Sequence, residues 1–217
     1  DARWANFHGE RNATVVSLIR GACGSEGHPL VVICGDEDTG KSHLLQAACH
    51  DYEQSGRSAV GFSLAELEEL GPQALSGVEA MDLIALDDVH LVIGQPDWEE
   101  ALFHLYNRAR DLRRQVMITL DNTPSTQTFV LADLRSRFQE GLLVQLGTYR
   151  DDDRVTILQA RAEQRGLVLS DEVAGFIMRR SSRRLGVLLS VLDQLDENSL
   201  RAQRRLTIPF VKSVMGW

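Results

Sequence analysis

The sequence predicts an α/β fold in which a five-stranded parallel sheet is flanked by helices and followed by a small all-α lid domain. Three observations lead to this prediction. Short apolar runs alternate with helical periods as far as residue 148, and a glycine-rich segment follows the first run. Beyond residue 150 only helical periods occur. Because such alternation is typical of parallel sheets with right-handed crossovers, we assign residues 1–149 to an α/β domain and 150–217 to a helical domain.

Each expected strand is a short apolar run bounded by turn residues. The runs are 30–34, 59–64, 82–86, 115–121 and 142–146. The first run is continuously apolar, as expected of a strand that is buried on both faces of a sheet. Amphipathic helices are expected at 41–54 and 98–113, where apolar residues recur on one face.

The helical domain is expected to contain four helices, at 151–165, 171–180, 184–201 and 207–215. Asp151 and Ser170 have side chains that commonly cap helix N-termini. Pro209 falls in a first helical turn, where proline is tolerated.

Composition limits the classes of function. The chain has 217 residues, of which 43% are hydrophobic and 25% charged, as in ordinary globular proteins. It contains no apolar run near the roughly 18 residues of a membrane span and no cationic leader, so we expect a cytoplasmic protein without a membrane partner. The formal charge of −8 predicts weak or no direct DNA binding. The cysteines lack paired spacing and are expected to be idle thiols, and no structural metal is expected.

Residues 35–42 read GDEDTGKS and fit the phosphate-binding pattern G-x-x-x-x-G-K-[ST] in full. The pattern lies between an expected strand and an expected helix, which is the context that a P-loop requires. Glycines let backbone N–H groups surround phosphate oxygens, Lys41 adds a positive charge, and the Ser42 hydroxyl is a ligand for Mg²⁺. We therefore expect ADP or ATP with Mg²⁺. The expected nucleotide contacts here are Gly35, Asp38, Thr39, Gly40, Lys41, Ser42 and His43. The sequence leaves open whether three acids in the loop, Asp36, Glu37 and Asp38, lower the affinity.

A second acidic motif follows the expected strand at 82–86, which ends in Asp87 and Asp88. In P-loop NTPases a strand-end acid completes the Mg²⁺ shell and a neighbouring residue orients the attacking water. We therefore assign Asp87, with Ser42, to Mg²⁺ and Asp88 to catalysis. The alternative is that both acids only cap a turn.

Together these residues resemble the DnaA family of AAA+ P-loop NTPases. The resemblance rests on GKSHLLQA at 40–47, on the Asp87-Asp88 pair, on LRSRF at 134–138, and on a segment at 4–12 similar to the linker over adenine. Other segments are similar to the Hda-like branch, which switches DnaA off after initiation; these are 98–108, 192–196 and 203–212. The resemblance covers nearly the whole chain.

The resemblance implies a regulator that docks against ATP-bound DnaA and is tethered to the DNA polymerase sliding clamp. Arg137 would be an arginine finger that reaches the γ-phosphate held by DnaA; alternatively, it and Arg135 are surface arginines at a helix start. Asp121, or its neighbour Asn122, would be a polar sensor. The clamp-binding segment is expected before Trp4.

The same resemblance implies two nucleotide contacts outside the P-loop, Asn12 and Arg183. The family places a sensor arginine where this chain has Gly186, so the sequence leaves open whether Arg183 or Arg184 replaces it.

Other functions stay open at this point. They are a stand-alone DnaA-like or helicase-loader-like ATPase, a nucleotide-gated adaptor in which Arg137 does no chemistry, and the ATPase core of a longer initiator. Asp88 is one methylene shorter than the usual glutamate, so we expect slow intrinsic hydrolysis. No helix-turn-helix domain follows the fourth lid helix, which favours a regulator over an initiator. The sequence decides neither the working nucleotide nor whether the protein forms a homo-oligomer.

Overall fold

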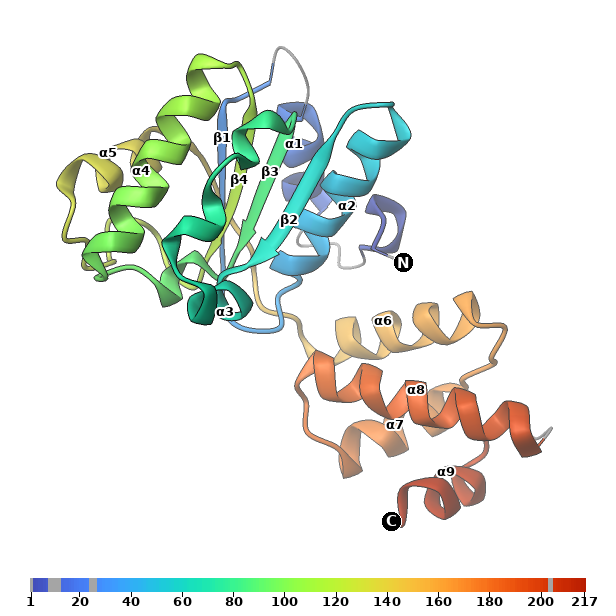
Figure 1. Ribbon diagram of the computed structural model, residues 1–217. Helices are drawn as coiled ribbons and strands as arrows, with labels where there is room; N and C mark the ends of the chain where they lie inside the picture. Colours follow the sequence, from blue (N-terminus) through green and yellow to red (C-terminus); the bar gives the residue numbers. More distant parts are fainter. Residues whose placement is uncertain (1, 8–12, 24–26, 203–204) are drawn as a thin grey trace. The chain divides into compact units, whose positions relative to one another are not determined.

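The computed structural model describes residues 2–7, 13–23, 27–202 and 205–217. The chain divides into two compact units, Asp1–Thr148 and Tyr149–Trp217 (Figure 1). Among the helices of these described ranges, none combines the length and the apolarity that a bilayer-crossing segment requires.

The first unit is built on a five-stranded sheet in the order β2-β3-β4-β1-β5. Its strands are β1 Leu30–Cys34, β2 Ala59–Ser63, β3 Leu83–Asp87, β4 Gln115–Leu120 and β5 Leu142–Gln145. Every pairing is parallel, so all the carboxyl ends of the strands meet at one edge. The predicted fold class is confirmed, and each strand lies within two residues of the expected run.

Helices on both faces separate the sheet from water. They are α1 Ala13–Ala22, α2 Lys41–Gln54, α3 Leu64–Leu67, α4 Pro96–Asp111 and α5 Ala132–Glu140. The sequence did not predict α1 or α5. In α5 only Leu134 and Phe138 are buried, and two apolar residues are too few to reveal a period. Arg137 lies in the last turn of α5 and not at its start, where the surface-arginine alternative placed it.

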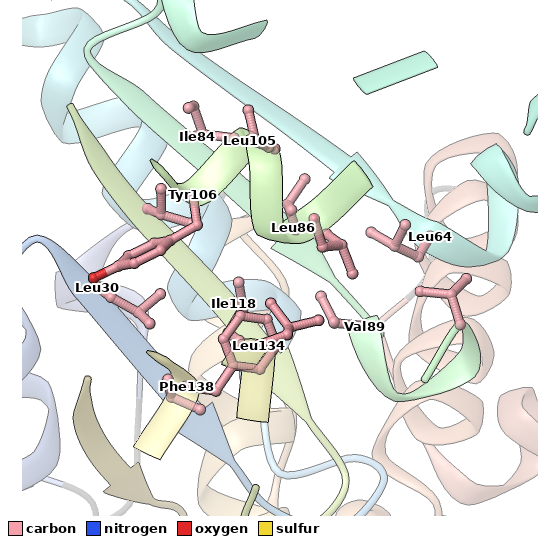
Figure 2. Close-up of a cluster of buried hydrophobic side chains, with 14 of the residues drawn as sticks. Leu30, Leu64, Ile84, Leu86, Val89, Leu105, Tyr106, Ile118, Leu134 and Phe138 are labelled. Atoms are coloured by element: carbon pink, nitrogen blue, oxygen red, sulfur yellow. The ribbon is translucent and has the colours of Figure 1, made fainter. Parts of the chain in front are cut away.

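Each face of the sheet has its own core, because successive strand residues point to opposite sides. Leu30 and Val32 of β1 pack with α4 and α5 (Figure 2). Val31 and Ile33 pack on the other side, with α1 and α2. This two-sided burial explains why β1 is apolar throughout: all of its residues are inaccessible to solvent.

The second unit contains the helices α6 Asp151–Gln164, α7 Asp171–Arg180, α8 Leu185–Ala202 and α9 Ile208–Met215. They enclose one apolar cluster that includes Leu158, Ile177 and Leu192. Ser170 caps α7 as predicted, since its hydroxyl accepts the Val173 N–H at 3.4 Å.

The predicted cap of the first lid helix is wrong. Asp151 is already the first residue of α6, and Arg150 stands at the capping position. The acid that satisfies the helix start is Asp153, whose carboxylate accepts the Arg150 N–H at 2.8 Å. Because three aspartates follow one another here, the sequence alone does not show which of them caps the helix.

Candidate nucleotide-binding site

The segment 35–42 connects β1 to α2 at the carboxyl edge of the sheet, and two of its glycines are required by geometry. A Cβ atom on Gly35 would lie 2.9 Å from Thr39 Oγ1 and 3.1 Å from Leu146 Cβ. Gly40 has φ of 92°, in the left-handed region that favours glycine. Gly35 therefore permits close packing at the start of the loop, and Gly40 permits a left-handed backbone conformation at its end.

Lys41 is folded into the loop that precedes it. Its side chain is buried, and Nζ donates to the carbonyl oxygens of Gly35 at 2.7 Å and Asp36 at 2.9 Å. An ammonium group has three donors, so these two bonds leave a third for an anion. Lys41 also begins α2, whose first-turn N–H groups and positive dipole end face the loop. The loop therefore encloses a positive charge at a helix N-terminus.

The acids of the loop differ in exposure. Asp36 and Glu37 are exposed, so water screens their charge, whereas Asp38 is half-buried with φ of 60°. The Asp36 carbonyl accepts bonds from Lys41 and from the Thr39 hydroxyl, the latter at 2.8 Å. Asp36 thus contributes to the shape of the loop through its backbone.

Asp87, the last residue of β3, and Asp88, which follows it, are fixed by a threonine from the neighbouring strand. Asp87 accepts a hydrogen bond from the Thr119 hydroxyl, and the Asp88 N–H donates to Thr119 Oγ1 at 2.8 Å and to Asp87 Oδ1 at 3.1 Å. Asp88 adopts φ of 56°, a conformation that aspartate tolerates. Burial, and then the charge of Asp87, raise the pKa of Asp88. The hydrogen bonds orient the Asp87 carboxylate and fix the backbone of Asp88.

Thr119 is a site residue that the sequence did not reveal. It is fully buried in β4, next to β3 in the sheet. The only signal in the sequence was one hydroxyl-bearing residue within a mostly apolar run. Threonine is common in strands because it is β-branched, so it does not stand out there.

Ser42 and Asp87 line one cleft of about 390 Å³ between α2 and the strands β2 and β3, together with Gly61 and Ala85. A hydroxyl and a carboxylate are hard oxygen ligands of the kind that Mg²⁺ takes. The donor set therefore fits Mg²⁺, while Ser42 is the one P-loop residue that lines this cleft.

The structure gives Asp121 a turn-forming role. Its Oδ1 accepts the Asn122 N–H at 2.7 Å and a bond from the Gln127 side chain, just beyond the end of β4. These bonds hold the loop after β4, and the assignment of Asp121 as a sensor stays a prediction.

The N-terminal segment packs near the start of α2. His43 Nε2 lies 3.0 Å from the Arg3 carbonyl oxygen, and its ring centroid is 5.6 Å from that of Phe7. Trp4 and Phe7 pack against the same core as α2. Asn12, the other expected contact from this segment, lies outside the described residues.

Arg137 lies on α5, where its Nη1 is 3.3 Å from Glu140 Oε2 and its side chain is one-third exposed. The start of α5 is held by Glu99, a fully buried acid of α4. The Glu99 carboxylate accepts the N–H groups of Val130 at 3.1 Å and Leu131 at 2.6 Å. Sequence reasoning missed Glu99, because an acid on an amphipathic helix is usually solvent-exposed.

Arg183 belongs to the second unit. Its Nη1 lies 2.9 Å from Asp151 Oδ2 at the start of α6, and its side chain is mostly exposed. The predicted nucleotide contact through Arg183 remains a prediction.

Burial raises the pKa of each of the three cysteine thiols, to about 11 for Cys23, about 12 for Cys34 and about 11 for Cys49. All are free, and at neutral pH they carry no thiolate, the reactive form of cysteine. Cys34 ends β1 directly before the P-loop, where it serves packing.

Sequence comparisons match two segments of the chain to family models. Residues 73–145 match the model of the bacterial DnaA ATPase domain, and residues 151–215 match that of the Hda lid domain. An uncharacterized protein of Haemophilus influenzae is 38% identical over 217 residues, which cover 100% of this chain and 94% of that protein.

Solved structures share the fold. Domain III of the Thermotoga maritima replication initiation protein DnaA superposes with a TM-score of 0.80 at 21% identity, over 100% of this chain and 96% of that one. AMPPCP-bound DnaA from Aquifex aeolicus gives 0.75 at 23% identity, over 94% and 69% of the respective chains. The Thermotoga maritima RuvB branch migration motor gives 0.72 at 15% identity, over 100% and 72%. Together, the two family-model matches show that the chain belongs to the DnaA family of AAA+ proteins, as an Hda-like member.

Proposed function

We propose that this protein is a regulator of replication initiation that binds an adenine nucleotide and stimulates hydrolysis of DnaA-bound ATP through Arg137. The observation that carries the proposal is a combination within one chain: an Hda-type lid at 151–215, a P-loop that encloses Lys41, and a surface arginine on α5. The AMPPCP-bound DnaA structure supports an adenine nucleotide as the ligand.

Different residues of the site would bind the phosphates and the Mg²⁺ ion. Lys41 and the N–H groups at the start of α2 would bind the phosphates, while Ser42 and Asp87 would hold Mg²⁺, with Asp87 oriented by Thr119. When bound, Mg²⁺ supplies positive charge to the phosphate oxygens. We further propose Asn12 and Arg183 as nucleotide contacts and Asp121 as a sensor.

Arg137 would act on the nucleotide of DnaA, not on its own. A guanidinium stabilises negative charge as the γ-phosphate is transferred, and such fingers accelerate hydrolysis by roughly 10³ to 10⁵. The ion pair with Glu140 is exposed on the surface, where such pairs contribute about 0–1 kcal/mol. Release of Arg137 from Glu140 therefore costs little compared with what the finger would contribute. A sliding clamp as tether and a cytoplasmic location complete the proposal.

The test is hydrolysis of ATP bound to DnaA, in the presence of clamp-loaded DNA. Arg137→Ala is expected to lower the stimulation by about a hundredfold or more. Two control variants are expected to keep it, Glu140→Gln because it frees the guanidinium, and Arg135→Ala because it removes an exposed neighbour on the same helix. Undiminished stimulation by Arg137→Ala would show instead a nucleotide-gated adaptor in which Arg137 does no chemistry.

Hydrolysis by the isolated protein tests the alternative of a stand-alone ATPase. Asp88 has the shorter acid side chain, and we expect slow turnover in the absence of DnaA. Turnover in the usual range of about 1 s⁻¹ or faster would favour a stand-alone ATPase.

A further inference from the structure

A second cleft lies at the opposite edge of the sheet, where the strands begin. Its volume is about 350 Å³, and it is lined by residues directly before β1 and β3, by the start of β4 and by the end of α4. Since the P-loop occupies the carboxyl edge, this cleft is separate from the nucleotide site.

The cleft concentrates positive charge in an acidic protein. Four guanidinium groups line it, from Arg57, Arg110, Arg113 and Arg114, against the single carboxylate of Asp82. With histidine neutral, four positive charges and one negative give +3, on a chain whose formal charge is −8. Such a local excess attracts anions.

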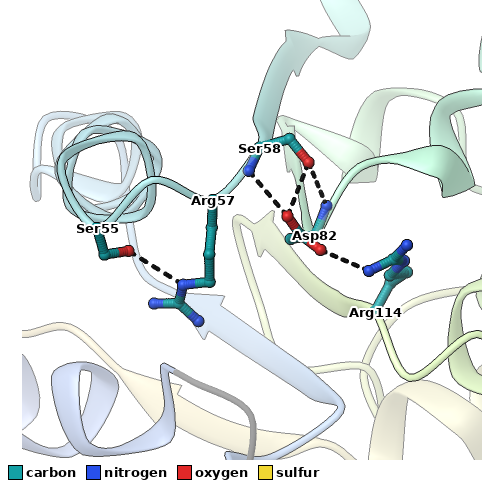
Figure 3. A network of polar contacts seen from close by, with 5 residues as sticks. All are labelled: Ser55, Arg57, Ser58, Asp82 and Arg114. Carbon is teal, nitrogen blue, oxygen red and sulfur yellow. Dashed lines mark hydrogen bonds and ion pairs between the residues drawn. The ribbon is translucent and has the colours of Figure 1, made fainter.

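The carboxylate of Asp82 already has hydrogen-bond and ion-pair partners within the protein. Asp82 accepts hydrogen bonds from the backbone N–H and the hydroxyl of Ser58, both at 2.9 Å, and pairs with Arg114 (Figure 3). Only one of the four arginines is therefore neutralised by it.

Among the other guanidinium groups of the cleft, that of Arg110 has Nη2 3.8 Å from Asp111 Oδ1 in an exposed ion pair. Arg57 lies 3.6 Å above the Tyr52 ring, and its Nε donates to Ser55 Oγ at 3.0 Å. Within the described ranges neither Arg57 nor Arg113 forms an ion pair, and the buried Nε of Arg114 has no hydrogen-bond acceptor. The cleft therefore retains unused donors and charge.

Arg113 is kept in a strained conformation at this site. It follows the end of α4 with φ of 55°, in the left-handed region where helices usually end with glycine. The turn closes through the Arg113 N–H to Arg110 O at 3.0 Å and the Arg114 N–H to Ala109 O at 2.8 Å, backbone bonds that glycine would also form. The arginine side chain is thus present at a position where the turn itself favours glycine.

We propose that this cleft binds a small phosphate-bearing anion at a site distinct from the P-loop. Several guanidinium forks around one cavity match the paired oxygens of phosphate groups, to which arginine binds bidentately. The cavity is in the size range of small-molecule sites, about 300–1,000 Å³, and its concentrated positive charge favours a compact anion such as pyrophosphate.

Titration calorimetry with inorganic pyrophosphate tests the proposal. The measurement uses Lys41→Ala, so that the P-loop does not contribute, and compares it with Lys41→Ala/Arg113→Gly and Lys41→Ala/Arg110→Gln. Each added change is expected to weaken binding about tenfold or more, because each removes a charged hydrogen-bond donor. Lys41→Ala/Arg179→Ala is the matched control, since Arg179 is an exposed arginine in the last turn of α7.

Arg113→Gly is also expected to raise the unfolding temperature while it weakens binding. General damage to the fold would instead lower the unfolding temperature and binding together. Loss of all pyrophosphate binding in Lys41→Ala, or equal binding by the cleft variants, would overturn the proposal. A lower unfolding temperature for Arg113→Gly would remove the strain argument. Cleft-dependent binding of a single-stranded oligonucleotide but not of pyrophosphate would assign the site to a nucleic-acid backbone and contradict a small ligand.

Discussion

Thr119 holds the acidic end of β3 in place through one buried hydroxyl, which donates to Asp87 and accepts from the Asp88 N–H. Asp87, the proposed Mg²⁺ ligand, is therefore oriented by a residue 32 positions further along the chain. Second-sphere contacts of this kind tune how well a ligand binds its metal.

Thr119→Val should lower the free energy of unfolding by about 1–3 kcal/mol, because it keeps the volume and removes a buried hydrogen-bonding group. It should also weaken Mg·ADP binding. Urea unfolding and calorimetry measure the two effects. Thr119→Ser keeps the hydroxyl, so equal nucleotide affinity in both variants would contradict this role.

Asp88 should make the stability depend on pH. Its pKa is raised in the folded protein by burial and by Asp87, so the folded state favours the protonated form. Above the folded pKa, where Asp88 is ionised in both states, its charge lowers the free energy of unfolding. At a pH where Asp88 is protonated in both states, this loss is absent. We expect Asp88→Asn to be more stable than the wild type near pH 7, with an advantage that disappears below the unfolded pKa of about 3.9. Asp36→Asn, at an exposed acid, is the control; an advantage that grew toward acid would contradict the assignment.

Residues whose proposed role depends on local sequence spacing can be picked out from the sequence, whereas residues that act through tertiary contacts cannot. Gly35, Lys41 and Asp87 lie in motifs of fixed spacing beside a strand. Thr119 and Glu99 become site residues only when the sheet and α4 bring them to partners far away in sequence.

Among the elements, α5 is positioned by α4. Glu99 links them, since its carboxylate accepts N–H groups at the residues just before α5 and also that of Gly94 at 2.7 Å. The helix that carries Arg137 therefore has a defined start even though only two of its residues are buried.

Glu99→Gln should lower the free energy of unfolding by about 1.5–3 kcal/mol. The Glu99 carboxylate offers two charged oxygens to three N–H groups, whereas an amide side chain has a single, uncharged acceptor oxygen. Hydrogen exchange should show faster opening of α5 than in the wild type. Glu100→Gln, at the exposed neighbour on α4, should change neither. An unchanged α5 in Glu99→Gln would show that the carboxylate is not what positions it.

The elements that the sequence revealed are those with enough buried residues to show a period. The strands β1, β3 and β4 were found because burial on both faces makes them apolar runs, and α2 and α4 because they are long. By contrast, α5 has nine residues and two apolar anchors, and its position depends on the polar contact of Glu99.

For the whole molecule, the chain forms two units with separate cores, Asp1–Thr148 and Tyr149–Trp217. The P-loop and Asp87 both belong to the first unit. A ligand that binds only the folded state should therefore stabilise that unit, by about 2.7 kcal/mol at a concentration of 100 times its Kd.

The most direct measurement of the central claim is calorimetric titration of Mg·ADP into the wild-type protein and into Lys41→Ala. The P-loop geometry predicts one nucleotide per chain for the wild type and an affinity at least about tenfold lower for the variant, which loses the buried ammonium. Equal affinities, or no binding by the wild type, would contradict the assignment of residues 35–42 as a nucleotide site.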